Sequence, residues 1–97
     1  MSIGVIVEFN LKPEGTALMT ETMKERLPET RKWDGCDYVY LQAAQDDPNH
    51  LYLVERWASR EQYDTYREWA MAQPGTEKIV EHLIGEMKTT YLDDTGA

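Results

Sequence analysis

The first apolar segment, residues 3–11, alternates side chains with the period of two that is typical of a β-strand. One set of its positions holds Ile3, Val5, Val7 and Phe9. Similar segments at 36–43, 50–57 and 86–92 predict three further strands, because they are rich in β-branched and aromatic residues. The second and third strands should form a hairpin. Its turn is expected at Asp46, Asp47, Pro48 and Asn49.

Between the strands, apolar residues recur at the spacing of amphipathic helices. The segment from 16 to about 32 predicts a first helix, bent or ended near Pro28. Its inward side chains are Leu18, Met19, Met23 and Leu27. Ser59 and Gln62 form a capping box that begins a second helix, which should run to about Met71.

A short third helix is predicted to begin with Thr76 as its N-cap and to end at Gly85. Its inward side chains are expected to be Ile79, Val80 and Leu83. The resulting order is that of the α+β ferredoxin-like split βαβ fold, with a four-stranded antiparallel sheet. One domain accounts for residues 1–97, with a core over about 3–92 and a loose polar tail at 93–97.

The strands carry apolar residues on both faces. In the third strand, Leu51, Leu53 and Trp57 share one face, whereas Tyr52 and Val54 share the other. An antiparallel sheet with one solvated face should instead show a polar stripe. Because the helices can cover only one face, the sequence predicts a homodimer in which the second face meets a twofold copy.

Composition restricts the partners and the compartment. A net charge of -8 without a basic stripe disfavours nucleic acid and anionic membrane surfaces. No apolar run approaches the roughly 20 residues of a membrane helix, so no membrane partner is expected. Cys36 is the single cysteine and cannot form an internal disulfide. Together with the lack of a hydrophobic leader, this favours a cytoplasmic location.

Aromatic residues gather at the end of the third strand and along the second helix. Trp57, Tyr63, Tyr66 and Trp69 can line one slot for a planar ring, and ordinary core packing is the alternative. Glu55 has the same strand parity as Trp57 and should point the same way. Partial desolvation there would raise its pKa toward that of a useful base, unless an arginine across the sheet pairs with it.

Two further polar residues are candidates for the site. His82 lies beside the inward positions of the third helix and titrates in a range suited to a proton shuttle, with surface exposure as the alternative. Asn10 ends the first strand, where it can donate to a substrate or cap the following turn.

Three segments together resemble the antibiotic biosynthesis monooxygenase domain. They are 29–36 with its Gly-Cys turn, the Asp-Asp-Pro hairpin at 46–48, and the Glu-Arg-Trp junction within 53–61. The resemblance extends to Leu92 and implies a dimeric α+β barrel in which two sheets pack face to face. This scaffold hosts cofactor-free oxygenases of hydroquinones and anthrones, haem-degrading enzymes and isomerases, so the resemblance alone does not select one activity.

The resemblance also carries over individual residues. It places Trp57 and Tyr63 where anthrone-oxygenating members have a pocket Trp and Tyr. Those members have an Asn four residues before the Trp, where this chain has Leu53. Many quinol-type members have a His nine residues after the Trp, where this chain has Tyr66, so a histidine-based mechanism is not carried over.

The sequence contains no CxxC, no His-x-x-x-His, no glycine-rich phosphate loop and no nucleophile elbow. Neither a metal nor a cofactor is therefore expected. These observations favour a cofactor-independent monooxygenase that uses dioxygen on a small aromatic quinol or polyketide-like phenol. The alternatives are a dimeric module that binds a small molecule without turnover, and an oxygen-independent isomerase.

Overall fold

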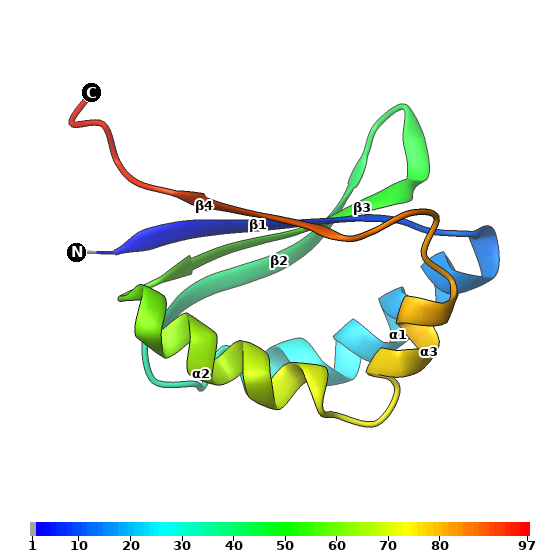
Figure 1. The fold of residues 1–97 in the computed structure, drawn as a ribbon, viewed down its shortest axis with the longest axis horizontal. Coiled ribbons are helices and arrows are strands. Elements are labelled where there is room, and N and C mark those ends of the chain that lie inside the picture. Colours follow the sequence, from blue (N-terminus) through cyan, green and yellow to red (C-terminus); the bar gives the residue numbers. More distant parts are fainter. Residues whose placement is uncertain (1) are drawn as a thin grey trace.

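The computed structural model describes residues 2–97 and contains a four-stranded antiparallel sheet in the order β2-β3-β1-β4. The strands are β1 (Ile3–Asn10), β2 (Cys36–Ala44), β3 (Asp47–Trp57) and β4 (Lys88–Leu92). Helices α1 (Pro13–Thr30), α2 (Arg60–Met71) and α3 (Thr76–Glu81) all lie on one face of the sheet (Figure 1). The predicted α+β ferredoxin-like fold is thereby confirmed. None of the helices within residues 2–97 has the length and hydropathy needed to cross a membrane.

The core lies between the sheet and the helices. Alternate residues of the two central strands point toward the helices, and most of them are buried. They include Val5, Val7, Phe9, Leu51 and Trp57. The inward side chains of the first helix, Met19, Met23 and Leu27, pack against them. The alternation in the sequence therefore predicted the buried face of both strands correctly.

Two elements begin at residues other than the predicted ones. Helix α1 begins at Pro13 and not at residue 16, because proline suits the first turn, where its missing N–H has no partner to lose. The helix continues past Pro28 and ends at Thr30. Strand β4 begins at Lys88, whereas Glu86 was predicted.

Helix α3 is shorter than predicted and differs in its cap. Thr76 is the first helical residue and not the N-cap, and its hydroxyl donates to the carbonyl of Ala70 at 2.8 Å. The helix ends at Glu81, before the predicted Gly85. Val80 was predicted to point inward; it lines the cavity described below but is still 41% exposed. The short helix therefore buries a narrower stripe than its sequence suggested.

The hairpin between β2 and β3 has a tighter turn than predicted. Residues 45–46 form the turn, whereas Asp47, Pro48 and Asn49 already belong to β3. The pairing register shifts next to Ala44, which pairs with Asp47. A proline is tolerated at such an irregularity because the ladder does not need its missing N–H.

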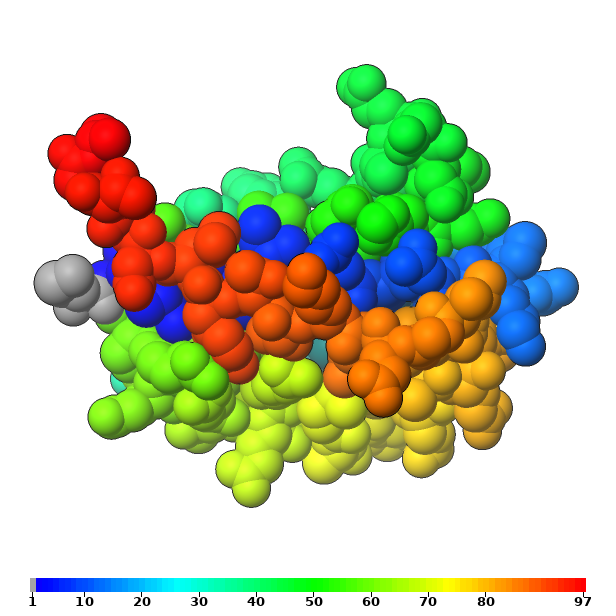
Figure 2. All heavy atoms as spheres, turned by 45° about the horizontal axis from the view of Figure 1, so that its top comes forward, coloured from blue at the N-terminus to red at the C-terminus, as the bar shows by residue number. Residues whose placement is uncertain are grey.

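The second face of the sheet carries no helix, and we call it the open face. Half-buried or exposed apolar side chains gather on it from three strands. They are Ile6, Tyr38, Tyr40, Tyr52 and Val54. The tip of the β2–β3 hairpin and the C-terminal segment project on this side at opposite ends of the sheet (Figures 1 and 2). The open face is therefore an apolar surface bordered by two projections.

At Gly35, in the turn before β2, adding a single methyl group should destabilise the fold strongly. Its φ of 94° is in the left-handed region, and an added Cβ would lie 2.6 Å from the Cδ atom of Gln62. Gln62 is held there by Ser59, the confirmed N-cap of α2, and by Asp34. We expect Gly35→Ala to lower the free energy of unfolding by about 2 to 3 kcal/mol, as measured by denaturant titration.

Gly85→Ala is the matched control for this substitution. Gly85 also has a positive φ, 76°, but an added Cβ would meet no atom within 4 Å. Gly85→Ala should therefore lower the free energy of unfolding only by the strain of the left-handed backbone conformation, about 1 kcal/mol. Equal losses in the two variants would show that the contact with Gln62 contributes nothing.

Candidate functional site

A cavity of about 70 Å³ lies between the sheet and the three helices. Strands β1 and β3 supply one wall, and α1, α2 and α3 supply the others. The apolar lining consists of Val7, Phe9, Met19, Met23, Leu53, Ala70, Met71, Ile79, Val80 and Met87. Figure 2 shows a small opening on the surface between β4 and α2. The cavity is therefore an apolar chamber formed by elements from the whole length of the chain.

A few polar side chains interrupt this apolar lining. They are Arg26, Glu55, Tyr63, Tyr66, Arg67 and Thr76. Two of these residues are cationic and one is a carboxylate, so the polar part of the lining can bind and exchange protons. Within residues 2–97, no group of three or more His, Cys, Asp or Glu side chains is placed to hold a metal ion.

Glu55 is the buried carboxylate of the cavity and is only 3% exposed. Its Oε1 accepts a hydrogen bond of 3.0 Å from Nε1 of Trp57, which lies two residues along the same strand face. Burial raises the pKa of Glu55 from 4.5 to about 7, although the Trp57 bond and the charge of Arg67 oppose this rise. Glu55 therefore changes its charge near neutral pH.

The predicted alternative for Glu55 was an ion pair with an arginine across the sheet. Among residues 2–97, no cationic side chain lies within ion-pair distance of Glu55. Arg67 influences the carboxylate through space, while its own Nη1 donates to the Thr89 hydroxyl at 2.9 Å. The carboxylate thus faces the cavity with an indole as its hydrogen-bond donor.

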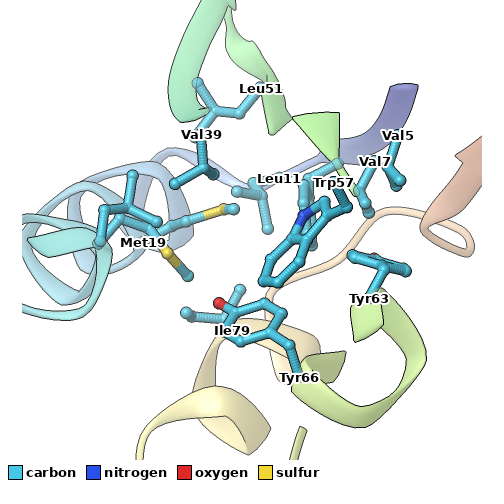
Figure 3. Packing of buried hydrophobic residues seen from close by; sticks show 13 residues of the cluster. Val5, Val7, Leu11, Met19, Val39, Leu51, Trp57, Tyr63, Tyr66 and Ile79 are labelled. Carbon is cyan, nitrogen blue, oxygen red and sulfur yellow. The ribbon is translucent and has the colours of Figure 1, made fainter. Parts of the chain in front are cut away.

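The aromatic slot expected between Trp57 and Tyr63 is closed. The ring centroids of these two residues are 5.7 Å apart with the rings edge to face, and Trp57 stacks on Tyr66 at 5.0 Å (Figure 3). Trp57 is fully buried and does not line the cavity. No planar molecule fits between rings that already touch. Trp57 therefore belongs to the core, from which it contacts three residues of the cavity lining, Glu55, Tyr63 and Tyr66.

Tyr63 and Tyr66 do line the cavity, and their hydroxyls differ in partners. The Tyr66 hydroxyl shares a 2.8 Å hydrogen bond with that of Thr30, which is fully buried. Within residues 2–97, the Tyr63 hydroxyl has no such partner. Burial raises the pKa of both phenols, so both stay protonated at neutral pH. Tyr63 is therefore free to donate to a ligand.

The remaining predicted site residues lie away from the cavity. Trp69 packs against Trp33 with ring centroids 5.3 Å apart, outside the lining. His82 follows the last residue of α3, and its Nδ1 lies 2.7 Å from the Lys78 carbonyl. Asn10 is exposed at the end of β1. The structure thus brings together Glu55, Tyr63 and Tyr66 of the predicted set, but not these three residues.

Both arginines of the lining were missed in the sequence. Arg26 continues the spacing of Met19 and Met23 along the inward face of α1, and Arg67 follows Tyr63 by four residues on α2. Helical spacing could therefore have identified them. Arginine is usually assigned to the solvent, so neither residue was included among the inward positions of its helix.

Several solved structures share this fold. The Mycobacterium tuberculosis protein Rv0793 has a TM-score of 0.79 and 24% identity, covering 97% of this chain and 95% of that chain. A structure described as an antibiotic biosynthesis monooxygenase has a TM-score of 0.78 and 23% identity, covering 96% and 98%. A conserved protein from Methanosarcina mazei Go1 has a TM-score of 0.78 and 21% identity, covering 94% and 90%. At such identities the likeness establishes the fold.

The sequence itself matches a family model. Among curated proteins, none matches the chain at a significant level. The model for antibiotic biosynthesis monooxygenase, however, matches residues 2–84. This match runs from β1 through α3 and includes every polar residue of the cavity lining. The resemblance inferred from the sequence is thus confirmed, and the chain belongs to the antibiotic biosynthesis monooxygenase family.

Proposed function

We propose that this protein is a cofactor-independent monooxygenase that oxidises a small aromatic quinol or phenol with dioxygen. The observation that carries the proposal is Glu55, a buried carboxylate in an apolar cavity with a pKa of about 7. A general base is most effective when its pKa lies near the working pH. The family membership supports the same reaction class.

In the proposed reaction, Glu55 takes the proton of a phenolic hydroxyl and leaves an electron-rich phenolate. A ring carbon of this phenolate transfers electrons to dioxygen and forms a C–O bond, and Glu55 returns its proton to give a hydroperoxide. Loss of the hydrogen on that carbon then breaks the O–O bond and releases water. One phenol and one dioxygen give one quinone and one water, so the substrate supplies all the electrons.

Two groups of the lining can stabilise the phenolate. Tyr63 offers a protonated hydroxyl without a partner among residues 2–97, and Arg67 places a positive charge near Glu55. Preorganised donors of this kind favour the anion in a cavity whose lining is mostly apolar. The deprotonated substrate is therefore the species that the cavity favours.

The cavity must widen to admit a ring. Its volume of about 70 Å³ is roughly half of the 150 Å³ cavity that is known to hold benzene in another protein. Four flexible thioether side chains line it, those of Met19, Met23, Met71 and Met87. Methionine changes rotamer readily, so we propose that these side chains move when the substrate enters.

Oxygen uptake with a panel of hydroquinones tests the proposed function. We expect dioxygen consumption that depends on both protein and substrate, with an equal amount of the ring-oxygenated hydroxyquinone formed and no hydrogen peroxide. A rate at the buffer background for every substrate would instead indicate a binding module. Conversion of the substrate that continues without oxygen would indicate an isomerase.

We also propose that a second copy of the chain covers the open face. The apolar residues of this face and its two flanking projections support this arrangement. Val54 lies at its centre, paired with Ile6 on one side and Tyr40 on the other. A lysine there would bury an unpaired charge in the interface, which typically costs several kcal/mol.

Sedimentation equilibrium should therefore show a dimer at micromolar concentration, and Val54→Lys should weaken it by about a hundredfold or more. Ile84→Lys is the matched control, because Ile84 is 59% exposed and lies outside the sheet. It should leave the dimer intact. A monomeric wild-type protein would contradict the proposed assembly.

A further inference from the structure

Arg26 occupies a boundary between the cavity and the surface. Its side chain lines the internal cavity, and it also lines an outer hollow of about 170 Å³ between α1 and the segment that follows α2. Trp69, Gln73 and Pro74 form part of this outer hollow. A guanidinium at this position can contact a ligand that lies inside the chamber or passes into it.

The guanidinium of Arg26 has no partner among residues 2–97. No carboxylate lies within ion-pair distance, and the side chain makes no hydrogen bond, although Glu25 and Glu29 line the same outer hollow. The four other arginines each have a partner. Arg31 donates to a carbonyl, Arg67 to a hydroxyl, and Arg56 and Arg60 pair with carboxylates.

This lack of a partner is costly for a half-buried charge. Burial lowers the pKa of the Arg26 guanidinium from its ordinary value, and only the nearby Tyr66 opposes this shift. A partly desolvated guanidinium binds an anion more tightly than an exposed one does, because its water has already been removed.

The charge of the lining points to the same kind of ligand. Two guanidiniums, Arg26 and Arg67, and one carboxylate, Glu55, leave a net charge of +1 when Glu55 is ionised. The chain as a whole carries -8. The cavity therefore has the opposite sign to the rest of the molecule, and it favours a negatively charged substrate over a neutral one.

We propose that Arg26 binds a carboxylate of the substrate, and that the substrate is a phenol or quinol bearing such a group. Arginine can hold a carboxylate through two parallel hydrogen bonds, which also fixes the orientation of the ring. Arg26 on α1 and Glu55 on β3 line the same cavity, so one substrate can contact Arg26 through its carboxylate and Glu55 through its hydroxyl. This inference rests on the proposed function and adds the residue that selects the substrate.

Anaerobic calorimetric titration tests the inference without any turnover. The probes are 2,5-dihydroxybenzoate and hydroquinone, which differ by one carboxylate. We expect the wild-type protein to bind the acid about tenfold more tightly or better, as a hydrogen-bonded charge pair implies. Arg26→Gln should remove this preference, so that the acid and hydroquinone bind the variant with similar affinity.

Lys24→Gln is the matched control, because it removes the same charge from the same helix at an exposed position outside the cavity. It should retain the preference for the acid. Absence of tighter acid binding in the wild type would overturn the inference, as would an equal loss in both variants. Oxygen uptake that occurs with neutral quinols but not with carboxylate-bearing ones would also overturn the inference, while leaving the proposed function in place. A preference for the acid without any oxygen uptake would support the anion site and refute the oxygenase.

Discussion

Replacing Glu55 by glutamine should lower oxygen-dependent turnover by about a hundredfold or more, which is the usual contribution of a general base. Glutamine keeps the shape of the side chain, and its carbonyl can still accept the Trp57 hydrogen bond. The loss would therefore report the missing base and not a collapsed cavity. Oxygen uptake with the best quinol of the panel measures it.

The same substitution should stabilise the fold above neutral pH. The pKa of Glu55 is about 7 in the folded chain and 4.5 ordinarily, so the folded state binds more protons between these values. The contribution of Glu55 to the free energy of unfolding is therefore complete below pH 4.5, and it is lost as the pH rises through about 7. At about 1.4 kcal/mol per pKa unit, the loss approaches roughly 3 kcal/mol, and Glu55→Gln should remove it.

Glu68→Gln serves as the control for both effects. Glu68 is an exposed carboxylate on α2, so its loss changes the net charge equally without touching the cavity. It should change neither turnover nor the dependence of stability on pH. Full turnover by Glu55→Gln would exclude Glu55 as the base.

Replacing Trp57 by phenylalanine should move the pH dependence of turnover to higher pH. The indole N–H stabilises the ionised form of Glu55, so its removal raises the pKa of Glu55 further. A hydrogen bond to a charged group contributes about 1.5 to 3 kcal/mol, which corresponds to roughly one to two pKa units. Turnover near neutral pH should fall about tenfold and recover in alkaline buffer.

Trp69→Phe makes the same chemical change in the same aromatic cluster without touching Glu55. Trp69 packs against Trp33 and Tyr66 and does not line the cavity. Its variant should keep the wild-type pH profile even if it is less stable. An unshifted profile in Trp57→Phe would mean that the indole does not hold the carboxylate.

Regular spacing in the sequence predicted much of this site. Side chains two residues apart on a strand share a face, and this is why Glu55 was correctly expected to point the same way as Trp57. The same spacing argument placed Tyr63 and Tyr66 on the inward face of α2, where both line the cavity. Local geometry was sufficient for these residues because each relation lies within one element.

Spacing did not predict where the empty volume lies. Trp57 and Tyr66 are on different elements, and their stacking fills the space that was expected to hold a substrate. His82 was expected beside the inward positions of α3, but the helix ends at Glu81 and His82 does not line the cavity. Such outcomes depend on how elements pack and where they end, which a periodic pattern does not encode.

The sheet order also determines when the fold can be completed. Strand β1 lies between β3 and β4, so its partners are made long after it, and Glu8 pairs with both Tyr52 and Lys88. The β2–β3 hairpin, by contrast, can close locally through its tight turn. During synthesis, β1 therefore emerges first and stays an apolar strand with two unpaired edges. Capture of β1 by the hairpin would cover one of these edges before the last strand is made, and so reduce the exposure of β1 to aggregation.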